Sequence, residues 1–473
     1  MMARERSPGM KLFLTGVVAA VLIVPLMMVY ALIWDRENQS NQAQTQVTAG
    51  WGGAQTITGP LLVIPYNGEV TETETVNGVA QQRTRNVRRE LFVSPTEQDI
   101  ETRIDPERRG YAIYESVVYE AEITGTARFA LDGDLERLGV ERDSLLLDQA
   151  ELRFGISDPR GLTDGASVRA GGETIQLSPG NGPAATGGSG FSAPVEWDAE
   201  APLSVAFQYG LRGSRSLALV PRGGETAWQV TSPWPHPSFT GSFMPQEPEV
   251  GADGFTATYP GITNLALGQR LLSLSDGGNP GMAMAVEAAA YDESYAREMR
   301  AAGQNASPVV IGLVDPVDLY SQVDRAVKYG FLFIGFTFAT FFMFDVVGGA
   351  RVSAAEYLLT GTGLVLFFVM LLAFAEVIGF AWAYIVAAGA IIGLVTAYSA
   401  AVLGTWRRAG FIGAMLAGLY ALLFVLLNLE TYSLVIGSLL LFAALAGIMY
   451  ATRNIDWSAV RRSDEDPREG YTV

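Results

Sequence analysis

The residues best suited to chemistry lie in a proline-rich stretch, Trp234-Pro235-His236-Pro237-Ser238-Phe239. His236 is the chain's single histidine, and the prolines hold it in an extended segment. Its imidazole could contact a ligand or serve as a catalytic base. The alternative is a packed corner of aromatic and proline rings, in which the imidazole bonds a backbone group. The sequence lacks a second histidine and an obvious nucleophile motif, which favours the packed corner and leaves Trp234, His236 and Phe239 as candidate functional or structural residues.

Other catalytic or metal-binding patterns are weak. Asp158-Pro159-Arg160-Gly161 could form a carboxylate–guanidinium site, but Pro and Gly favour a turn in which Asp158 bonds its own backbone. The chain has no cysteine, which excludes disulfides, thiolate metal sites and a cysteine nucleophile. The sequence contains no phosphate-binding glycine loop, nucleophile elbow or zinc motif. We therefore expect no catalytic residue, no cofactor and no metal, and a protein that is not an enzyme.

A second group of candidate residues lies where polar sequence meets apolar sequence, between Asp315 and Val347. Asp315 and Pro316 suit the N-cap and the first turn of a helix. Asp324 and Lys328 are four apart and can pair on one helix face, and Arg325 and Tyr329 follow them directly in the chain. The following run, 330–347, is almost wholly apolar. The pattern predicts a capped amphipathic helix that leads directly into a membrane span and could transmit motion to it.

Six apolar segments are long enough to cross a bilayer, which needs about 20 residues. With 49% hydrophobic residues, the chain is too apolar for a purely soluble protein. The first segment could be a cleaved signal peptide, but it is long and no small-residue cleavage site follows, so we predict an uncleaved signal anchor. The segments are Leu12–Trp34, Gly330–Val347, Tyr357–Ala375, Val377–Leu403, Ala409–Leu427 and Tyr432–Ala451.

Basic residues predict the orientation of these spans, because they collect on the cytoplasmic side. With a cytoplasmic N-terminus, the inner side holds nearly all of the basic residues in the segments that flank the spans, whereas Arg36, Arg325 and Lys328 flank the outer side. Both termini are then cytoplasmic, and the large domain between the first two spans faces outward. The residues on the predicted inner side are Arg4, Arg6, Lys11, Arg351, Arg407, Arg408, Arg453, Arg461, Arg462 and Arg468.

The outward domain is acidic and rich in strand patterns. Residues 35–326 hold 21 arginines and 39 acidic residues, a net charge of −18, which disfavours nucleic acid as a partner. Short alternating segments separated by Gly and Pro predict a mainly antiparallel β-sandwich of one or two lobes. Predicted features include a hairpin turn at Asn77-Gly78, a turn at Arg222-Gly223-Gly224, short helices within 131–147 and 291–299, and strands at 59–66, 117–123, 152–156, 205–211 and 217–230.

These patterns predict a mixed membrane protein with four parts. Residues 1–34 form a cytoplasmic N-terminus and transmembrane anchor, and residues 35–326 form the periplasmic β-rich domain. Residues 327–452 form a five-helix transmembrane bundle, and residues 453–473 a cytoplasmic tail.

Five stretches, taken as a set, resemble the CreD family of bacterial inner-membrane proteins, described as cell envelope integrity proteins. They are Gly59–Pro65, Tyr111–Tyr114, Ser232–Gly241, Asp324–Tyr329 and Thr452–Trp457, and they span nearly the whole chain. The resemblance implies a place in the bacterial inner membrane and in a two-component-controlled envelope stress response. It also implies effects on colicin tolerance and, in some bacteria, on β-lactam susceptibility. It brings no catalytic residue, cofactor or substrate with it.

Three functions compete at this point. The first is a non-enzymatic protein that supports envelope integrity, with the lipid bilayer and an unknown envelope component or membrane protein as partners. The second is a transporter or lipid-handling protein that uses the five C-terminal spans, with a cavity lined by Thr360, Thr362, Thr396, Tyr398 and Ser399. The third is a hydrolase of the outward domain that uses His236. Few ionisable residues lie inside the spans, which favours the first over the second. The sequence leaves the oligomeric state open.

Overall fold

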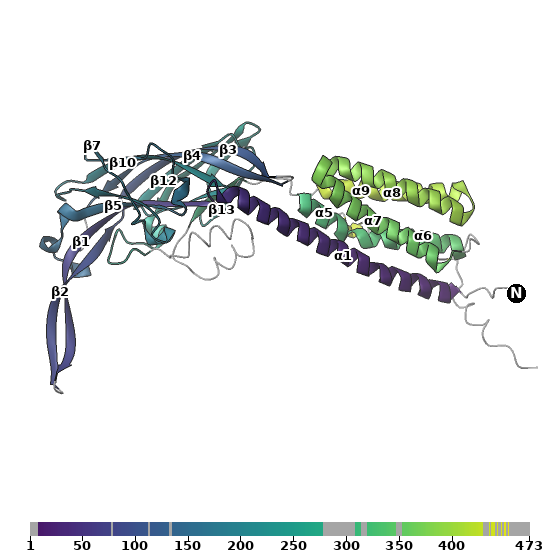
Figure 1. Cartoon of the computed structure of the whole chain (residues 1–473), viewed down its shortest axis with the longest axis horizontal. Coiled ribbons are helices and arrows are strands. Elements are labelled where there is room, and N and C mark those ends of the chain that lie inside the picture. Colours follow the sequence, from purple (N-terminus) through teal and green to yellow (C-terminus); the bar gives the residue numbers. More distant parts are fainter. Residues whose placement is uncertain are drawn as a thin grey trace, which may run out of the picture. The chain divides into compact units, whose positions relative to one another are not determined.

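The computed structural model describes residues 8–76, 79–111, 114–131, 135–277, 308–313, 319–346 and 352–428, with separate positions between 435 and 453 (Figure 1). The chain divides into two compact units. One comprises Gln42–Pro316, here called the β domain, and the other comprises Met1–Asn41 together with Val317–Val473, here called the helical unit. The predicted helix at 291–299 lies outside the described residues.

The β domain contains two sheets, named A and B. Sheet A has nine strands, including β1 (Gln55–Val76) at its centre, and sheet B has eight, including β3 (Glu97–Tyr111). Sheet A runs in the order β13 (Pro237–Gly241), β17 (Val309–Leu313), β11 (Ser216–Val220), β1, β5 (Ala150–Ile156), β9 (Gly190–Val195) and β8 (Ser178–Pro179), with β2 (Val79–Val93) on β1 and β16 (Leu272–Ser273) on β2. Sheet B runs in the order β14 (Gln246–Gly251), β15 (Gly254–Thr263), β12 (Glu225–Ser232), β3, β4 (Tyr114–Phe129), β10 (Leu203–Ser214), β6 (Ser167–Ala170) and β7 (Glu173–Ile175).

Both sheets are mixed, which refines the predicted antiparallel sandwich. β1 pairs with β11 in parallel, and β3 pairs with β12 in parallel, whereas the other described ladders are antiparallel. The segment Arg222-Gly223-Gly224 is not the turn of a hairpin. It connects β11 of sheet A to β12 of sheet B, so the chain changes sheets there. Alternation of polar and apolar residues predicts a strand but does not show which strand lies beside it. For this reason the sequence did not predict the crossover.

The predicted strand segments are confirmed, and short 3-10 turns at Glu136–Leu138 and Arg142–Ser144 occupy the predicted helical region. The two sheets pack face to face around one large apolar core. Aromatic rings join them: Phe154 of β5 lies edge-on to Phe207 of β10, with ring centres 5.4 Å apart. Phe191 of β9 meets Tyr209 of β10 in the same way at 5.6 Å. Such edge-to-face contacts stabilise a core beyond the burial of apolar area.

Gln55, the first residue of β1, joins the two sheets through its fully buried amide. Its Nε2 donates to the carbonyl oxygens of Arg212 on β10 at 2.9 Å and of Asp158 at 3.1 Å. Its Oε1 accepts from the Ser157 hydroxyl at 3.0 Å and from the Asp158 N–H at 3.2 Å. A Cβ atom at Gly161 would collide with the Arg212 carbonyl, so the backbones approach this closely only because glycine stands there.

The helical unit contains five helices of membrane-spanning length and composition among the described residues. The first lies within α1 (Pro8–Ala49), and the second combines α5 (Leu319–Lys328) with α6 (Gly330–Val346). The others are α7 (Ala354–Ile378), α8 (Phe380–Leu403) and α9 (Trp406–Asn428). The sixth predicted span, Tyr432–Ala451, lies largely outside the described residues.

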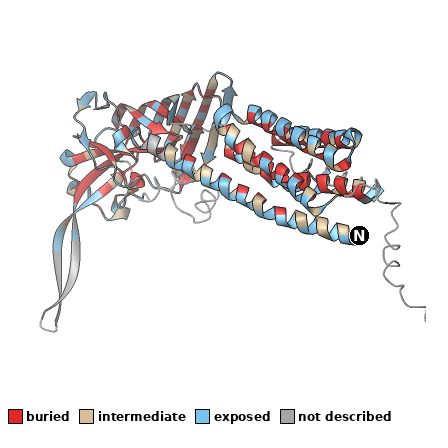
Figure 2. Ribbon diagram, turned by 45° about the vertical axis from the view of Figure 1, so that its right-hand side comes forward, coloured by how far each residue is buried: buried red, intermediate tan, exposed pale blue. Residues whose placement is uncertain are grey.

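α1 touches the rest of the helical unit along a narrow stripe of buried residues, and most of its other positions are exposed or intermediate (Figure 2). Leu22 and Leu26 in this stripe lie against Gly361 of α7 and Gly330 of α6, respectively, where a Cβ atom would crowd them. Nearer the start of α1, Lys11 Nζ lies 2.8 Å from Asp345 Oδ1 of α6. The Asp345 side chain is only 2% exposed, so its charge depends on this lysine.

We predict that Gln55→Met weakens the β domain. The substitution keeps the volume but leaves buried carbonyl, hydroxyl and N–H groups without partners, which should lower the free energy of unfolding by about 3 kcal/mol. Pulse proteolysis of the full-length protein in increasing urea measures this loss. Gln208→Met is the matched control, because Gln208 is exposed and bonds Glu122 on the surface; its effect should stay below about 0.5 kcal/mol. Equal losses would contradict the role given to Gln55.

We predict that Lys11→Met releases α1, because an unpaired buried carboxylate costs about 3–5 kcal/mol. Since the chain has no cysteine, Leu22→Cys with Gly361→Cys reports the docking of α1 by disulfide formation. Lys11→Met should abolish most of this cross-link, and exchanging the charges with Lys11→Asp and Asp345→Lys should restore it. Lys328→Met, which removes an exposed lysine paired with Asp324, is the control and should leave the cross-link unchanged. An unaffected cross-link in Lys11→Met would show that the ion pair does not hold α1.

Candidate functional site

A row of four polar residues crosses four neighbouring strands of sheet B. The strand registers place Glu249 of β14 opposite Thr256 of β15, Thr256 opposite Thr231 of β12, and Thr231 opposite Arg103 of β3. All four are exposed or half-buried, whereas their neighbours along β3, β12 and β15 are buried, so the row lies on the outer face of the sheet. Adjacent strands are about 4.8 Å apart, so the row extends over roughly 14 Å.

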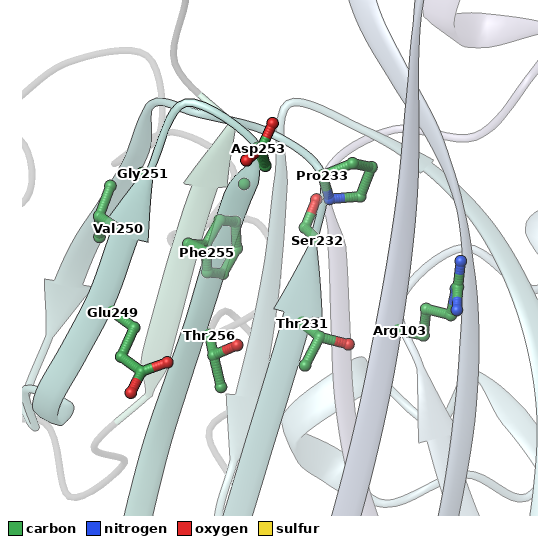
Figure 3. Close-up of a pocket in the computed structure, with 11 residues that line it drawn as sticks. Arg103, Thr231, Ser232, Pro233, Glu249, Val250, Gly251, Asp253, Phe255 and Thr256 are labelled. Atoms are coloured by element: carbon green, nitrogen blue, oxygen red, sulfur yellow. The ribbon is translucent and has the colours of Figure 1, made fainter.

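This row, here called the Glu–Arg row, lies along an open hollow of about 620 Å³ (Figure 3). Asp253 in the β14–β15 turn adds a second carboxylate, and Phe255, whose ring is buried in the core, also borders the hollow. The remaining lining residues are Ser232, Pro233, Val250, Gly251 and Gly254. The row therefore presents the Glu249 carboxylate at one end and hydroxyl groups in the middle. At the other end is the Arg103 guanidinium, which lies 3.4 Å from Asp105 Oδ2. Such a surface can hydrogen-bond a ligand that carries hydroxyl or amide groups and charges of both signs.

The proline-rich stretch supports this hollow from behind. Trp234, next to the lining residue Pro233, is buried, and its Nε1 donates to the His236 carbonyl at 3.1 Å. The Arg108 guanidinium lies over the Trp234 ring, 5.4 Å from its centre. Phe239 on β13 packs perpendicular to Phe255, with ring centres 5.7 Å apart. Two of the predicted residues, Trp234 and Phe239, thus hold residues that line the hollow.

His236 is placed differently. It is exposed, it precedes β13, and it is not among the residues that line the hollow. The structure gives its backbone carbonyl a role, as the acceptor for the Trp234 indole N–H. The hollow on sheet B therefore does not bring His236 together with a carboxylate and a hydroxyl, as the hydrolase hypothesis required. Within the described part of the chain, no group of three or more His, Asp or Glu side chains could hold a metal ion.

Asp158 combines the two alternatives that the sequence left open. Its Oδ1 accepts from the Arg160 backbone N–H at 3.1 Å, as in a turn, and its carboxylate also pairs with the Arg160 guanidinium at 2.8 Å. These hydrogen bonds and the positive charge hold the pKa of Asp158 below its usual value. The pair is local and lies beside Gln55, so it supports the junction of the sheets and not the hollow.

The junction helix α5 lies in the helical unit, although the predicted domain boundary at 326 placed most of it with the polar domain. Its N-cap candidates, Asp315 and Pro316, lie outside the described residues. Val323 and Val327 are buried as the amphipathic pattern predicts. The predicted pair is confirmed: Lys328 Nζ lies 2.7 Å from Asp324 Oδ2.

α5 does not run straight into the next span. Tyr329 stands between α5 and α6 as a turn residue, and the chain continues as α6 from Gly330. The hydroxyl of Tyr320 donates to Glu376 Oε1 of α7 at 3.2 Å, which holds α5 against the bundle. Arg325 is half-buried on the same helix. Among the four candidates of this segment, the structure thus joins Asp324 to Lys328 and places Tyr329 between the two helices.

The described interior of the helical unit is packed around aromatic rings from three helices, α7, α8 and α9. Phe367 lies 4.5 Å from Tyr420 and 5.5 Å from Tyr384 between ring centres, and the Tyr384 hydroxyl donates to the Tyr420 carbonyl at 2.7 Å. A space between α6 and α9, beside Tyr329, measures only about 10 Å³ and is lined by apolar and aromatic residues. That is about the volume needed for one water molecule.

The five polar residues proposed to line a transport cavity are not gathered around that space. Thr360 and Ser399 are buried, Thr362 is exposed and bonds the Leu358 carbonyl of its own helix, and Thr396 and Tyr398 are half-buried. In the described spans the notable buried charge is instead Asp345, paired with Lys11 as described above.

Sequence reasoning missed the Glu–Arg row. Glu249 and Arg103 lie far apart in the chain, and each is one of many charged residues in an acidic domain. Only the Ser232–Gly241 stretch pointed toward this region, because Ser232 and Pro233 line the hollow. No pattern in one strand can reveal a row that depends on the registers of four strands.

Comparison with known proteins agrees with this architecture. The family described as "CreD: Inner membrane protein CreD" matches residues 7–458. The inner membrane protein CreD of Escherichia coli (strain K12) is 30% identical over 451 residues, covering 93% of this chain and 91% of that protein.

Solved structures give weaker matches. The M1 zinc metallopeptidase of Deinococcus radiodurans, alone and as a mutant with bound substrate, matches with TM-scores of 0.20 and 0.23 at 9% identity, over 47% of this chain and 42% of that one. Scores this low indicate neither a shared overall fold nor a shared activity. The sequence match to CreD, in contrast, extends over nearly the whole chain. On this evidence the chain belongs to the CreD family of inner membrane proteins.

Proposed function

We propose that this protein is a non-enzymatic inner membrane protein that supports the integrity of the cell envelope. In this proposal α1 is an uncleaved anchor, both termini are cytoplasmic, and the β domain lies in the periplasm. The Glu–Arg row on sheet B binds an envelope component that carries hydroxyl or amide groups. The observation that carries the proposal is the alignment of Glu249, Thr256, Thr231 and Arg103 along one open hollow.

The shape and chemistry of the hollow support binding over catalysis. It is open and lies on a rigid sheet, and its charged groups are at opposite ends of the row and not together at one reacting centre. A catalytic base must lie within hydrogen-bond reach of the group it deprotonates, and a nucleophile needs such a base beside it. A surface that recognises a polymer or a partner protein needs only complementary groups at fixed spacing.

The alternative, a transporter or lipid-handling protein, finds less support in the described spans. Transport sites normally gather polar or ionisable groups around a cavity near the middle of the bilayer. Here the described interior is filled by the rings of Phe367, Tyr384 and Tyr420. The buried pair of Lys11 and Asp345 is a feature in its favour, but its position at the docking of α1 favours a structural role.

We predict that Thr231→Val with Thr256→Val impairs envelope function. Both changes keep a β-branched residue in the strand and remove two hydroxyls from the centre of the Glu–Arg row. Losing two hydrogen bonds of about 1 kcal/mol each should weaken binding at least about tenfold. In cells that lack the chromosomal gene, the variant should fail to restore exclusion of a large antibiotic or dye, at an unchanged protein level. Thr258→Val is the control, because Thr258 is exposed on the same strand but does not line the hollow. Full restoration by the double variant would contradict the binding role of the row.

We predict that α5 must remain helical for function. Replacing Ser321 and Gln322 by glycine costs about 1 kcal/mol of helix stability at each position, whereas replacing both by alanine removes the same side chains and keeps the helix. The glycine pair should therefore abolish the exclusion phenotype without loss of protein from the membrane, and the alanine pair should preserve it. The assay is antibiotic or dye exclusion beside an immunoblot of membranes. If the two pairs behave alike, α5 serves as a tether and not as a link that transmits motion.

A further inference from the structure

A long two-stranded ribbon leaves the β domain at the end of β1 and the start of β2 (Figure 1). β1 pairs with β5 only as far as Val63, and its last further contact is a bridge from Tyr66 to Leu145. On the other side β2 meets β16 only at Phe92 and Val93. The stretches 67–76 and 79–88 therefore pair with each other and with no third strand among the described residues. Ten residues in a strand extend over roughly 33 Å.

The predicted hairpin is confirmed, because Val76 at the end of β1 pairs with Val79 at the start of β2, although Asn77 and Gly78 themselves lie outside the described residues. An isolated two-stranded ribbon is at best marginally stable in water, and it normally needs a third strand or an apolar face on a core. This ribbon has few apolar residues to bury. They are Val70, Val76, Val79, Ala80 and Val87.

The edges of the ribbon are unusual for this protein. The outermost strands of both sheets are short or interrupted, as is typical of edges that must not pair with other chains. β8 has two residues, β7 has three, β13 begins with Pro237, and β14 contains Pro248 and a register shift. The ribbon has neither proline nor a register shift along 67–88. Both of its edges therefore present long, regular rows of backbone N–H and C=O groups that can pair with a further strand.

The two edges carry opposite charge. The β1 stretch contains three glutamates and no basic residue, and the β2 stretch contains three arginines and no acidic residue. Pairing two β1 edges would place acid beside acid, and pairing two β2 edges would place base beside base. The β1 edge of one copy fits the β2 edge of another, and these strands run antiparallel when both ribbons point the same way.

One pairing register between two copies places every glutamate of the β1 stretch opposite an arginine of the β2 stretch. Within a single ribbon, Glu72 stands opposite Arg83, but Glu69 stands opposite Asn86 and Glu74 opposite Gln81. Shifting the pairing by two residues keeps every residue on its own face, because strand residues alternate with period two. Between two copies, this shifted register places Glu69 opposite Arg88, Glu72 opposite Arg85 and Glu74 opposite Arg83.

We propose that this ribbon is a self-association surface, in which the acidic β1 edge of one copy adds to the basic β2 edge of a second copy in the shifted register. Backbone hydrogen bonds supply most of the affinity, and the three acid–base pairs select the edge and the register. The contact joins two different edges, so it can continue from copy to copy as a ring or a row. This inference stands on the ribbon's register and charge, and it does not depend on the proposed role of the Glu–Arg row.

Engineered cysteines test the proposal in native membranes, since the chain has none of its own. Two tagged forms are co-expressed, one with Thr73→Cys and the other with Thr84→Cys, positions that the shifted register places opposite each other. Each chain then carries a single cysteine, so every disulfide joins two copies. We expect at least about fivefold more mixed dimer than from Thr73→Cys with Gln82→Cys, because directly opposed residues lie within disulfide reach and residues two positions apart do not.

Charge reversal tests the choice of edge. Adding Glu72→Arg and Glu74→Arg to both forms places arginine opposite arginine, and should reduce the Thr73–Thr84 dimer at least about fivefold. Adding Arg83→Glu and Arg85→Glu as well should restore it, which also shows that the variants fold. Equal yields at Thr84 and Gln82, or a dimer that is insensitive to the reversal, would overturn the proposal. Disulfides from either cysteine to a different protein, in place of the second copy, would overturn it too.

Discussion

The β domain depends on one buried amide. Gln55 stands where β1 begins and where the backbones of both sheets come within hydrogen-bond distance, and its amide satisfies groups from both sides at once. A second buried bond, from the Tyr119 hydroxyl of β4 to the Ser216 carbonyl at 2.8 Å, links the sheets nearby. Inside a protein such polar networks are strong when complete and costly when one member is missing. This network therefore holds the two sheets in one arrangement. It thereby also fixes the positions of the residues on their outer faces.

The position of the Glu–Arg row follows from this arrangement. β3 and β12 lie side by side in parallel because the chain leaves sheet A after β11 and enters sheet B at β12. That crossover brings Thr231 opposite Arg103, and the β14–β15 hairpin then adds Thr256 and Glu249 to the same row. Phe239, from sheet A, packs on Phe255 beneath the hollow. The proposed binding surface of the β domain thus draws on both sheets, although its polar groups come from one.

The helical unit follows a different rule, because lipid offers charged groups no solvation. Its described interior is aromatic, and the charge of Asp345 is tolerated through Lys11. α1 buries few apolar residues. Its docking depends on Leu22 and Leu26, which pack against glycines of α7 and α6, and on the ion pair between Lys11 and Asp345.

Much of the coarse organisation was readable from residue patterns. The apolar runs predicted the spans, alternation predicted the strands at β4, β5 and β10, and spacing predicted the pair of Asp324 and Lys328. These features depend on residues close together in the chain. The turn predicted at Arg222-Gly223-Gly224 is present between β11 and β12, but the sequence did not show that these strands belong to different sheets. Gly and Pro show that a strand ends, but not which sheet the next strand joins.

The sequence by itself therefore determined the membrane character of the chain, its family and the presence of a β-rich acidic domain, since composition and local periodicity encode these directly. The tertiary structure alone decided which residues meet. It placed Trp234 in the core and His236 on the surface, it paired Lys11 with Asp345, and it aligned Arg103 with Glu249 across four strands. Contacts of this kind depend on strand register, sheet crossover and helix docking, which form between segments far apart in sequence. No single segment holds that information, because each could pack equally well against several others until the whole core closes.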